Sequence, residues 1–112
     1  MTETTLDPED SKIITLARSS RARVGSTEGA AVRDETGRTY TATDVRLPSL
    51  TLTAVQVAAA MAVSSGARSL EAAALVTEAD GPHDADLGVV RDLGGRVLFV
   101  AGPDGAVKGR FQ

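Results

Sequence analysis

The sequence predicts one α/β domain with a three-layer architecture, in which helices cover both faces of a mixed sheet of four to five strands. Helix-like and strand-like segments alternate along the chain, which favours a sheet covered by helices on both sides. The 112 residues, 42% of them hydrophobic, suit one core and leave no room for a second. We expect residues 1–7 to form a disordered tail and residues 8–112 to form the domain.

The first third of the chain predicts a helix followed by a hairpin. Asp7 is a typical N-cap, and Pro8 suits the first helical position, so a helix is expected over about residues 8–22. Short strand-like runs over residues 29–34 and 38–45 are separated by a turn that contains Gly37.

The remainder alternates helices with strands. Residues 51–65 are nearly apolar on all sides, which predicts a buried central helix that ends at Gly66. Residues 70–77 form a continuous apolar run typical of a strand buried on both faces. We then expect a helix, a strand and an additional edge strand over residues 84–93, 96–101 and 106–111, respectively.

The composition excludes several classes of function. The chain has no cysteine, so it holds no disulfide, iron–sulfur cluster, thiolate-bound zinc or cysteine nucleophile. A net charge of -3 disfavours nucleic acid as a partner, since nucleic-acid modules carry a basic excess. Arg18, Arg21 and Arg23 fit the exposed face and last turns of the first helix, where cations complement the helix dipole.

No signal-peptide pattern is present at the acidic N-terminus, and no apolar run reaches the roughly 18 residues that a membrane span requires. We therefore expect a cytoplasmic protein with no membrane partner.

Five short phrases share their order and spacing with a known family. Over roughly residues 10–105 the chain resembles the small cytidine deaminases. The phrases are Glu28-Gly-Ala-Ala31, Asp34-Glu-Thr-Gly37, Ala42-Thr-Asp-Val-Arg46, Thr53-Ala-Val-Gln56 with its helix running to Gly66, and Pro82-His-Asp-Ala-Asp86. The resemblance implies the cytidine deaminase-like fold and a homo-oligomer, which an alanine-rich helix in so small a chain also favours.

The positions that carry the chemistry of that family differ here. The family holds zinc through a Cys or His at the start of the central helix and through the two cysteines of Pro-Cys-x-x-Cys, while a glutamate on the helix moves protons. The matching positions are Thr53, His83 and Asp86 for the ligands and Val55 for the glutamate. A threonine hydroxyl stays protonated at neutral pH, and valine cannot transfer a proton. We therefore expect a degenerate member with no catalytic residue, no zinc and no cofactor.

Two alternatives remain for the segment that contains His83 and Asp86. The first is a weakened site for a harder divalent ion, because histidine and aspartate can both be ligands of such an ion. The same segment also fits the start of a helix with acids in its first turn.

The residues expected to contact a sugar have also changed. The family's ribose-binding Asn and Glu match Asp44 and Arg46. An ionised Asp only accepts hydrogen bonds and an Arg only donates them. The change indicates a repurposed or unused pocket.

Other chemistry has little support, because the serines and threonines lack a nearby general base and the glycines match no phosphate-binding loop. Three hypotheses remain. The chain is a non-catalytic protein that self-associates or binds a protein partner, or it is a small-molecule binding module with a nucleoside-sized pocket lined by Asp44, Arg46, Thr53 and Val55. The third hypothesis is a deaminase with an atypical site.

Overall fold

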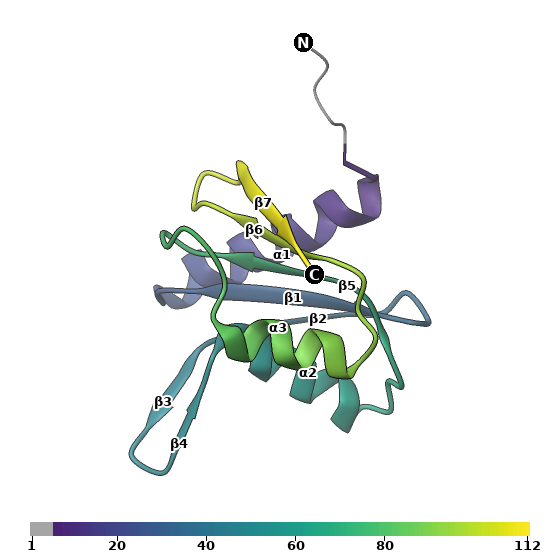
Figure 1. Cartoon of the computed structure of the whole chain (residues 1–112). Helices are drawn as coiled ribbons and strands as arrows, with labels where there is room; N and C mark the ends of the chain where they lie inside the picture. The colour runs from purple at the N-terminus through teal and green to yellow at the C-terminus, as the bar shows by residue number, and fades with distance from the viewer. Residues whose placement is uncertain (1–5) are drawn as a thin grey trace.

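A five-stranded mixed sheet forms the centre of the protein in a computed structural model that describes residues 6–112 (Figure 1). Strands β5 (Leu70–Val76) and β6 (Leu98–Ala101) run parallel, and every other pair of neighbours is antiparallel. This architecture confirms the predicted mixed sheet, including the additional strand at its edge. In the spatial order β2-β1-β5-β6-β7, the strands are β2 (Thr39–Thr43), β1 (Gly29–Asp34), β5 (Leu70–Val76), β6 (Leu98–Ala101) and β7 (Val107–Phe111).

Helices cover both faces of this sheet, as predicted (Figure 1). Helix α1 (Pro8–Val24) lies on one face, and α2 (Ala54–Ser64) and α3 (Asp84–Asp92) lie on the other. None of the helices in residues 6–112 has the length and apolar character needed to cross a membrane. Of the tail expected over residues 1–7, the first five residues lie outside the described part of the chain.

Helix α1 begins and ends where the sequence signals lie. The Asp7 carboxylate accepts a hydrogen bond from the Glu9 N–H at 2.8 Å, and Gly25 closes the helix in the left-handed conformation with φ 72°. The helix continues to Val24, slightly beyond the predicted end. Arg18 and Arg23 are exposed as expected, whereas Arg21 is half-buried.

Small residues let α1 lie close to the sheet. Ile13 and Ala17 of α1 pack against a cluster that includes Ala31, Ala74 and Phe99. Gly29, at the start of β1, sits directly under the helix, and a Cβ built there would lie 2.2 Å from the Ala17 carbonyl oxygen. Only glycine therefore fits at this crossing.

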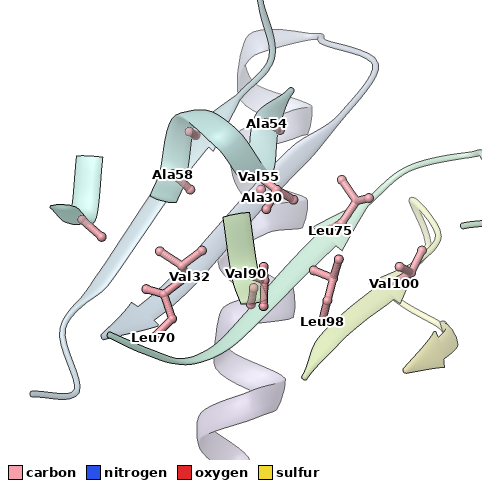
Figure 2. Close-up of a cluster of buried hydrophobic side chains, with 13 residues drawn as sticks. Ala30, Val32, Ala54, Val55, Ala58, Leu70, Leu75, Val90, Leu98 and Val100 are labelled. Atoms are coloured by element: carbon pink, nitrogen blue, oxygen red, sulfur yellow. The ribbon is translucent and has the colours of Figure 1, made fainter. Parts of the chain in front are cut away.

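A second core lies between the sheet and α2 with α3 (Figure 2). Val55 and Ala58 of α2 and Val90 of α3 pack over Val32, Leu75 and Leu98 of the sheet, among other residues. Alternate residues of β5 enter the two cores, which confirms the predicted strand buried on both faces.

The predicted start of the central helix at residue 51 is wrong. A hairpin of β3 (Val45–Leu47) and β4 (Leu50–Leu52) precedes α2 and extends away from the rest of the structure (Figure 1). Thr53 is the N-cap, because its hydroxyl oxygen accepts from the Gln56 N–H at 3.1 Å and the Gln56 side chain accepts from the Thr53 N–H at 2.9 Å. This reciprocal pair sets the start of the helix at Ala54.

The expectation of a buried central helix holds for only one side of α2. Ala54, Ala58 and Ala62 are buried, but Met61 is 41% exposed and Val63 is 49% exposed. The sheet and α3 cover only part of the circumference of α2, so one apolar side faces outward.

Candidate functional site

Three of the residues singled out in the sequence meet where α2 and α3 begin. Thr53 is the N-cap of α2, His83 is the N-cap of α3, and Asp86 lies in the first turn of α3. The Thr53 hydroxyl donates to Asp86 Oδ1 at 2.5 Å, and the His83 backbone N–H donates to Asp86 Oδ2 at 3.0 Å. The helix start predicted for the His83–Asp86 segment is therefore confirmed, and Asp86 links the two helix starts.

Asp86 is fully buried, at 0% exposure. A buried carboxyl group needs hydrogen bonds to replace those lost to water, and here each oxygen has one. The Thr53 hydroxyl is also fully engaged in hydrogen bonds, since it donates to Asp86 and accepts from the Gln56 N–H.

Glu28 belongs to the same region and was not identified as a site residue from the sequence. It directly precedes β1, and its side chain is 9% exposed. Its Oε2 lies 3.0 Å from His83 Nε2, although the two residues are 55 positions apart in the chain. In the sequence, Glu28 is only an acidic residue next to an apolar strand, and this pattern does not indicate which residue its side chain contacts.

Asp44 and Arg46 lie beside this group, at and after the junction of β2 and β3. Arg46 Nε donates to Asp44 Oδ2 at 3.0 Å, and the Thr27 hydroxyl lies 3.5 Å from the same oxygen. Asp44 Oδ1 is buried and has no hydrogen-bond partner within the described chain. Arg46 remains 70% exposed, so the charge of Asp44 is only partly offset.

These side chains surround an open cavity of about 300 Å³, lined by Glu28, Asp44, Arg46, Thr51, Leu52, Thr53 and His83. The predicted convergence of Asp44, Arg46 and Thr53 on one pocket agrees with this lining. The placement of Val55 in the pocket is wrong. Val55 is fully buried in the core between α2 and the sheet, because it lies on the side of the helix that faces the sheet (Figure 2).

The cavity offers two carboxylates, an imidazole and a guanidinium. Within residues 6–112 no three His, Asp or Glu side chains are grouped so that they could hold a metal ion. The arrangement is suited to hydrogen bonding and to charge complementarity with a small molecule.

Comparisons with known proteins agree with this fold. Residues 6–105 match the protein family described as cytidine deaminase-like. No curated protein sequence matches the chain.

Among solved structures, the cytidine deaminase of Burkholderia pseudomallei is 23% identical, with 90% of each chain covered and a TM-score of 0.77. The cytidine deaminase of Mycobacterium tuberculosis is 24% identical over 91% of this chain and 90% of that chain, with a TM-score of 0.69. That of Mycobacterium leprae is 20% identical, over 90% and 92% of the two chains, with a TM-score of 0.67. These likenesses show a shared fold, and the family match covers most of the sequence. The chain belongs to the cytidine deaminase-like family.

Proposed function

We propose that this chain is a non-catalytic member of its family that acts by self-association or by binding a protein partner. The observation that carries the proposal is the hydrogen bond between Thr53 and Asp86. These residues match two of the three positions at which the family resemblance implies zinc ligands. The Thr53 hydroxyl donates to Asp86 Oδ1, so both groups are already engaged in a hydrogen bond with each other.

The donor set does not fit zinc. Structural and catalytic zinc sites use thiolate, imidazole and carboxylate ligands, and a neutral threonine hydroxyl is a poor substitute. Of the matched positions, only His83 supplies an imidazole, and its Nε2 is occupied by Glu28. Asp86 is buried, with both oxygens engaged.

The proton-transfer group is also missing. Val55 occupies the position that matches the family's glutamate and is 0% exposed in an apolar core. Loss of general acid–base catalysis alone costs about 100-fold to 10,000-fold in rate.

Metal analysis together with a cytidine deamination assay tests the proposal. We expect the purified protein to hold far less than one zinc per chain and to deaminate cytidine and deoxycytidine no faster than buffer. About one zinc per chain after dialysis would overturn the proposal. Turnover that disappears in His83→Ala would do the same, and would favour a deaminase with an atypical site.

A restoration experiment tests the residue correspondence. Replacing Thr53, His83 and Asp86 together by cysteine should allow about one zinc to bind per chain. The matched control replaces the same three residues by alanine, which removes the same hydrogen bonds without adding thiolates. The correspondence fails if the cysteine variant, folded by circular dichroism, takes up no more zinc than the alanine variant.

An exposed apolar surface supports the association role. We call it the α2 surface and define it by Met61 and Val63 of α2, both of which are exposed. Leu47 and Leu50 are exposed as well, but they lie at the turn of the β3–β4 hairpin, which extends away from the rest of the structure (Figure 1). Helix α2 contains no charged residue. Depletion of charge around exposed apolar side chains is typical of the centre of a protein interface.

The cavity favours a second candidate function, a small-molecule binding module. Its volume of about 300 Å³ is at the lower end of ligand pockets, and its lining includes Asp44, whose Oδ1 is buried without a partner among residues 6–112. A thermal-shift screen of nucleosides and nucleotides tests this function, because a micromolar ligand at millimolar concentration stabilises the folded state by about 4 kcal/mol.

A further inference from the structure

We infer that the cavity next to Thr53 takes a small organic cation with several N–H donors, such as an amidinium or a guanidinium, in preference to a nucleoside or nucleotide. The inference rests on the second candidate function above, because it names the class of ligand for that binding module.

The buried polar groups of the cavity are acceptors of hydrogen bonds. The side chains of Glu28 and Asp44 are 9% and 11% exposed, respectively, and both residues line the cavity. Within residues 6–112, Glu28 makes its side-chain hydrogen bond through Oε2, and Asp44 makes its own through Oδ2. Asp44 Oδ1 is buried and has no hydrogen-bond partner among residues 6–112, so the negative charge of Asp44 is incompletely compensated there. A cation with N–H donors in the cavity would compensate it.

The positive charges nearby offset these carboxylates only in part. Arg46 is 70% exposed, and water screens its charge. It also donates to the Thr27 hydroxyl at 3.4 Å. The His83 side chain is more than half exposed. The buried charges of the cavity are therefore negative.

This charge pattern discriminates between ligand classes. A phosphate would add negative charge beside two poorly solvated carboxylates, which disfavours nucleotides. A nucleoside brings hydroxyl donors but no positive charge. An amidinium or guanidinium brings a positive charge and parallel N–H donors that match carboxylate geometry.

Three aromatic probes of matched shape test the inference on the full chain. Benzamidine is the cation, benzamide the neutral analogue and benzoate the anion. We expect benzamidine to raise the melting temperature and to bind at least about tenfold more tightly than benzamide, cytidine or cytidine monophosphate, and benzoate to cause no shift.

Two charge substitutions in the cavity should change the affinity for benzamidine in opposite directions. Asp44→Asn should weaken benzamidine binding by at least about tenfold, whereas Arg46→Gln should strengthen it severalfold, because it removes a repelling cation. Asp92→Asn is the matched control, since Asp92 is exposed on α3 and outside the cavity, and should leave binding unchanged. Circular dichroism and melting confirm that each variant is folded.

The inference is overturned if benzoate or cytidine monophosphate binds more tightly than benzamidine, if Arg46→Gln weakens benzamidine binding, or if no probe binds at millimolar concentration. Zinc content and deamination do not enter these outcomes. Failure here is therefore distinguishable from failure of the non-catalytic proposal.

Discussion

At the scale of single residues, Asp86 shows how a position matched to a metal ligand can serve the fold instead. Its carboxylate receives the Thr53 hydroxyl and the His83 N–H, and so joins the starts of two helices. The sequence predicted a helix start at His83–Asp86 from local signals. It did not predict Thr53 as the partner, because that contact spans 33 positions and depends on how α2 and α3 pack.

Thr53→Val should destabilise the protein by about 2–4 kcal/mol, because it removes an N-cap and leaves a buried carboxylate one donor short. Thr53→Ser keeps the hydroxyl and should cost less than about 1 kcal/mol. Urea unfolding of the two variants measures the difference. Equal losses would show that the hydroxyl contributes little.

A second buried carboxylate, Asp34, organises the turn between β1 and β2. It accepts hydrogen bonds from the N–H and hydroxyl of Thr36, from the Arg38 N–H and from the Tyr40 hydroxyl, at 2.7–3.1 Å. Burial alone would raise the pKa of Asp34, but the hydrogen bonds from Thr36, Tyr40 and Arg38 outweigh it, so the pKa is lowered.

Because the pKa of Asp34 is lowered in the folded state, the free energy of unfolding depends on pH. The contribution of Asp34 is present above the unfolded pKa of about 3.9 and is lost as the pH falls through the lower folded value. Asp34→Asn should therefore flatten the dependence of unfolding free energy on pH in this range, and Asp34→Ala should cost about 2–3 kcal/mol at pH 7. Denaturant titrations from pH 7 to about pH 3 measure both. Asp80→Asn is the control, because Asp80 is exposed. The role assigned to Asp34 is contradicted if the unfolding free energy of Asp34→Asn changes with pH as steeply as that of the parent protein.

At the scale of elements, local signals located most helices and strands but missed the β3–β4 hairpin. Each of its strands has three residues, too few to establish an alternating pattern. The apolar residues of β4 also continue directly into α2, which moved the predicted helix start to residue 51. The spacing of Thr53 and Gln56 was the available signal for the true start, since it is a capping-box pattern.

The crossing of α1 over β1 gives a paired glycine test. Gly29→Ala should cost about 3 kcal/mol or more, because its Cβ would meet the Ala17 carbonyl at 2.2 Å and the Arg21 Cβ at 2.8 Å. Gly88→Ala in α3 meets nothing within 4 Å and should stabilise by about 0.5–1 kcal/mol. Thermal or urea unfolding compares them. A neutral Gly29→Ala would mean that α1 can move away from the sheet without loss.

At the scale of the whole molecule, sequence patterning predicted the layers but only part of the site. Alternation of helices and strands and the apolar run of β5 depend on nearby residues, so they can be read locally. The pairing of Glu28 with His83 and the burial of Val55 away from the cavity depend on tertiary packing. Matching the site residues one by one to the positions of a family does not reveal which contacts the substituted residues make in this fold.

The α2 surface predicts self-association. Light scattering should give a mass of a dimer or tetramer rather than 11.5 kDa at high micromolar concentration. Val63→Lys should shift the protein toward the monomer, because it places a charge within the apolar surface. Val24→Lys is the control, since Val24 is also exposed but lies at the end of α1. A parent protein that is monomeric, or equal effects of the two variants, would contradict this surface as the interface.

Strand β5 has a further consequence for cooperativity. It is hydrogen-bonded to β1 on one side and β6 on the other, and its residues alternate between the two cores. Neither core can open fully while the other keeps β5 in place. The amide hydrogens of β5 should therefore exchange with solvent only when both layers separate together, so that two small alanine-rich cores behave as one unfolding unit.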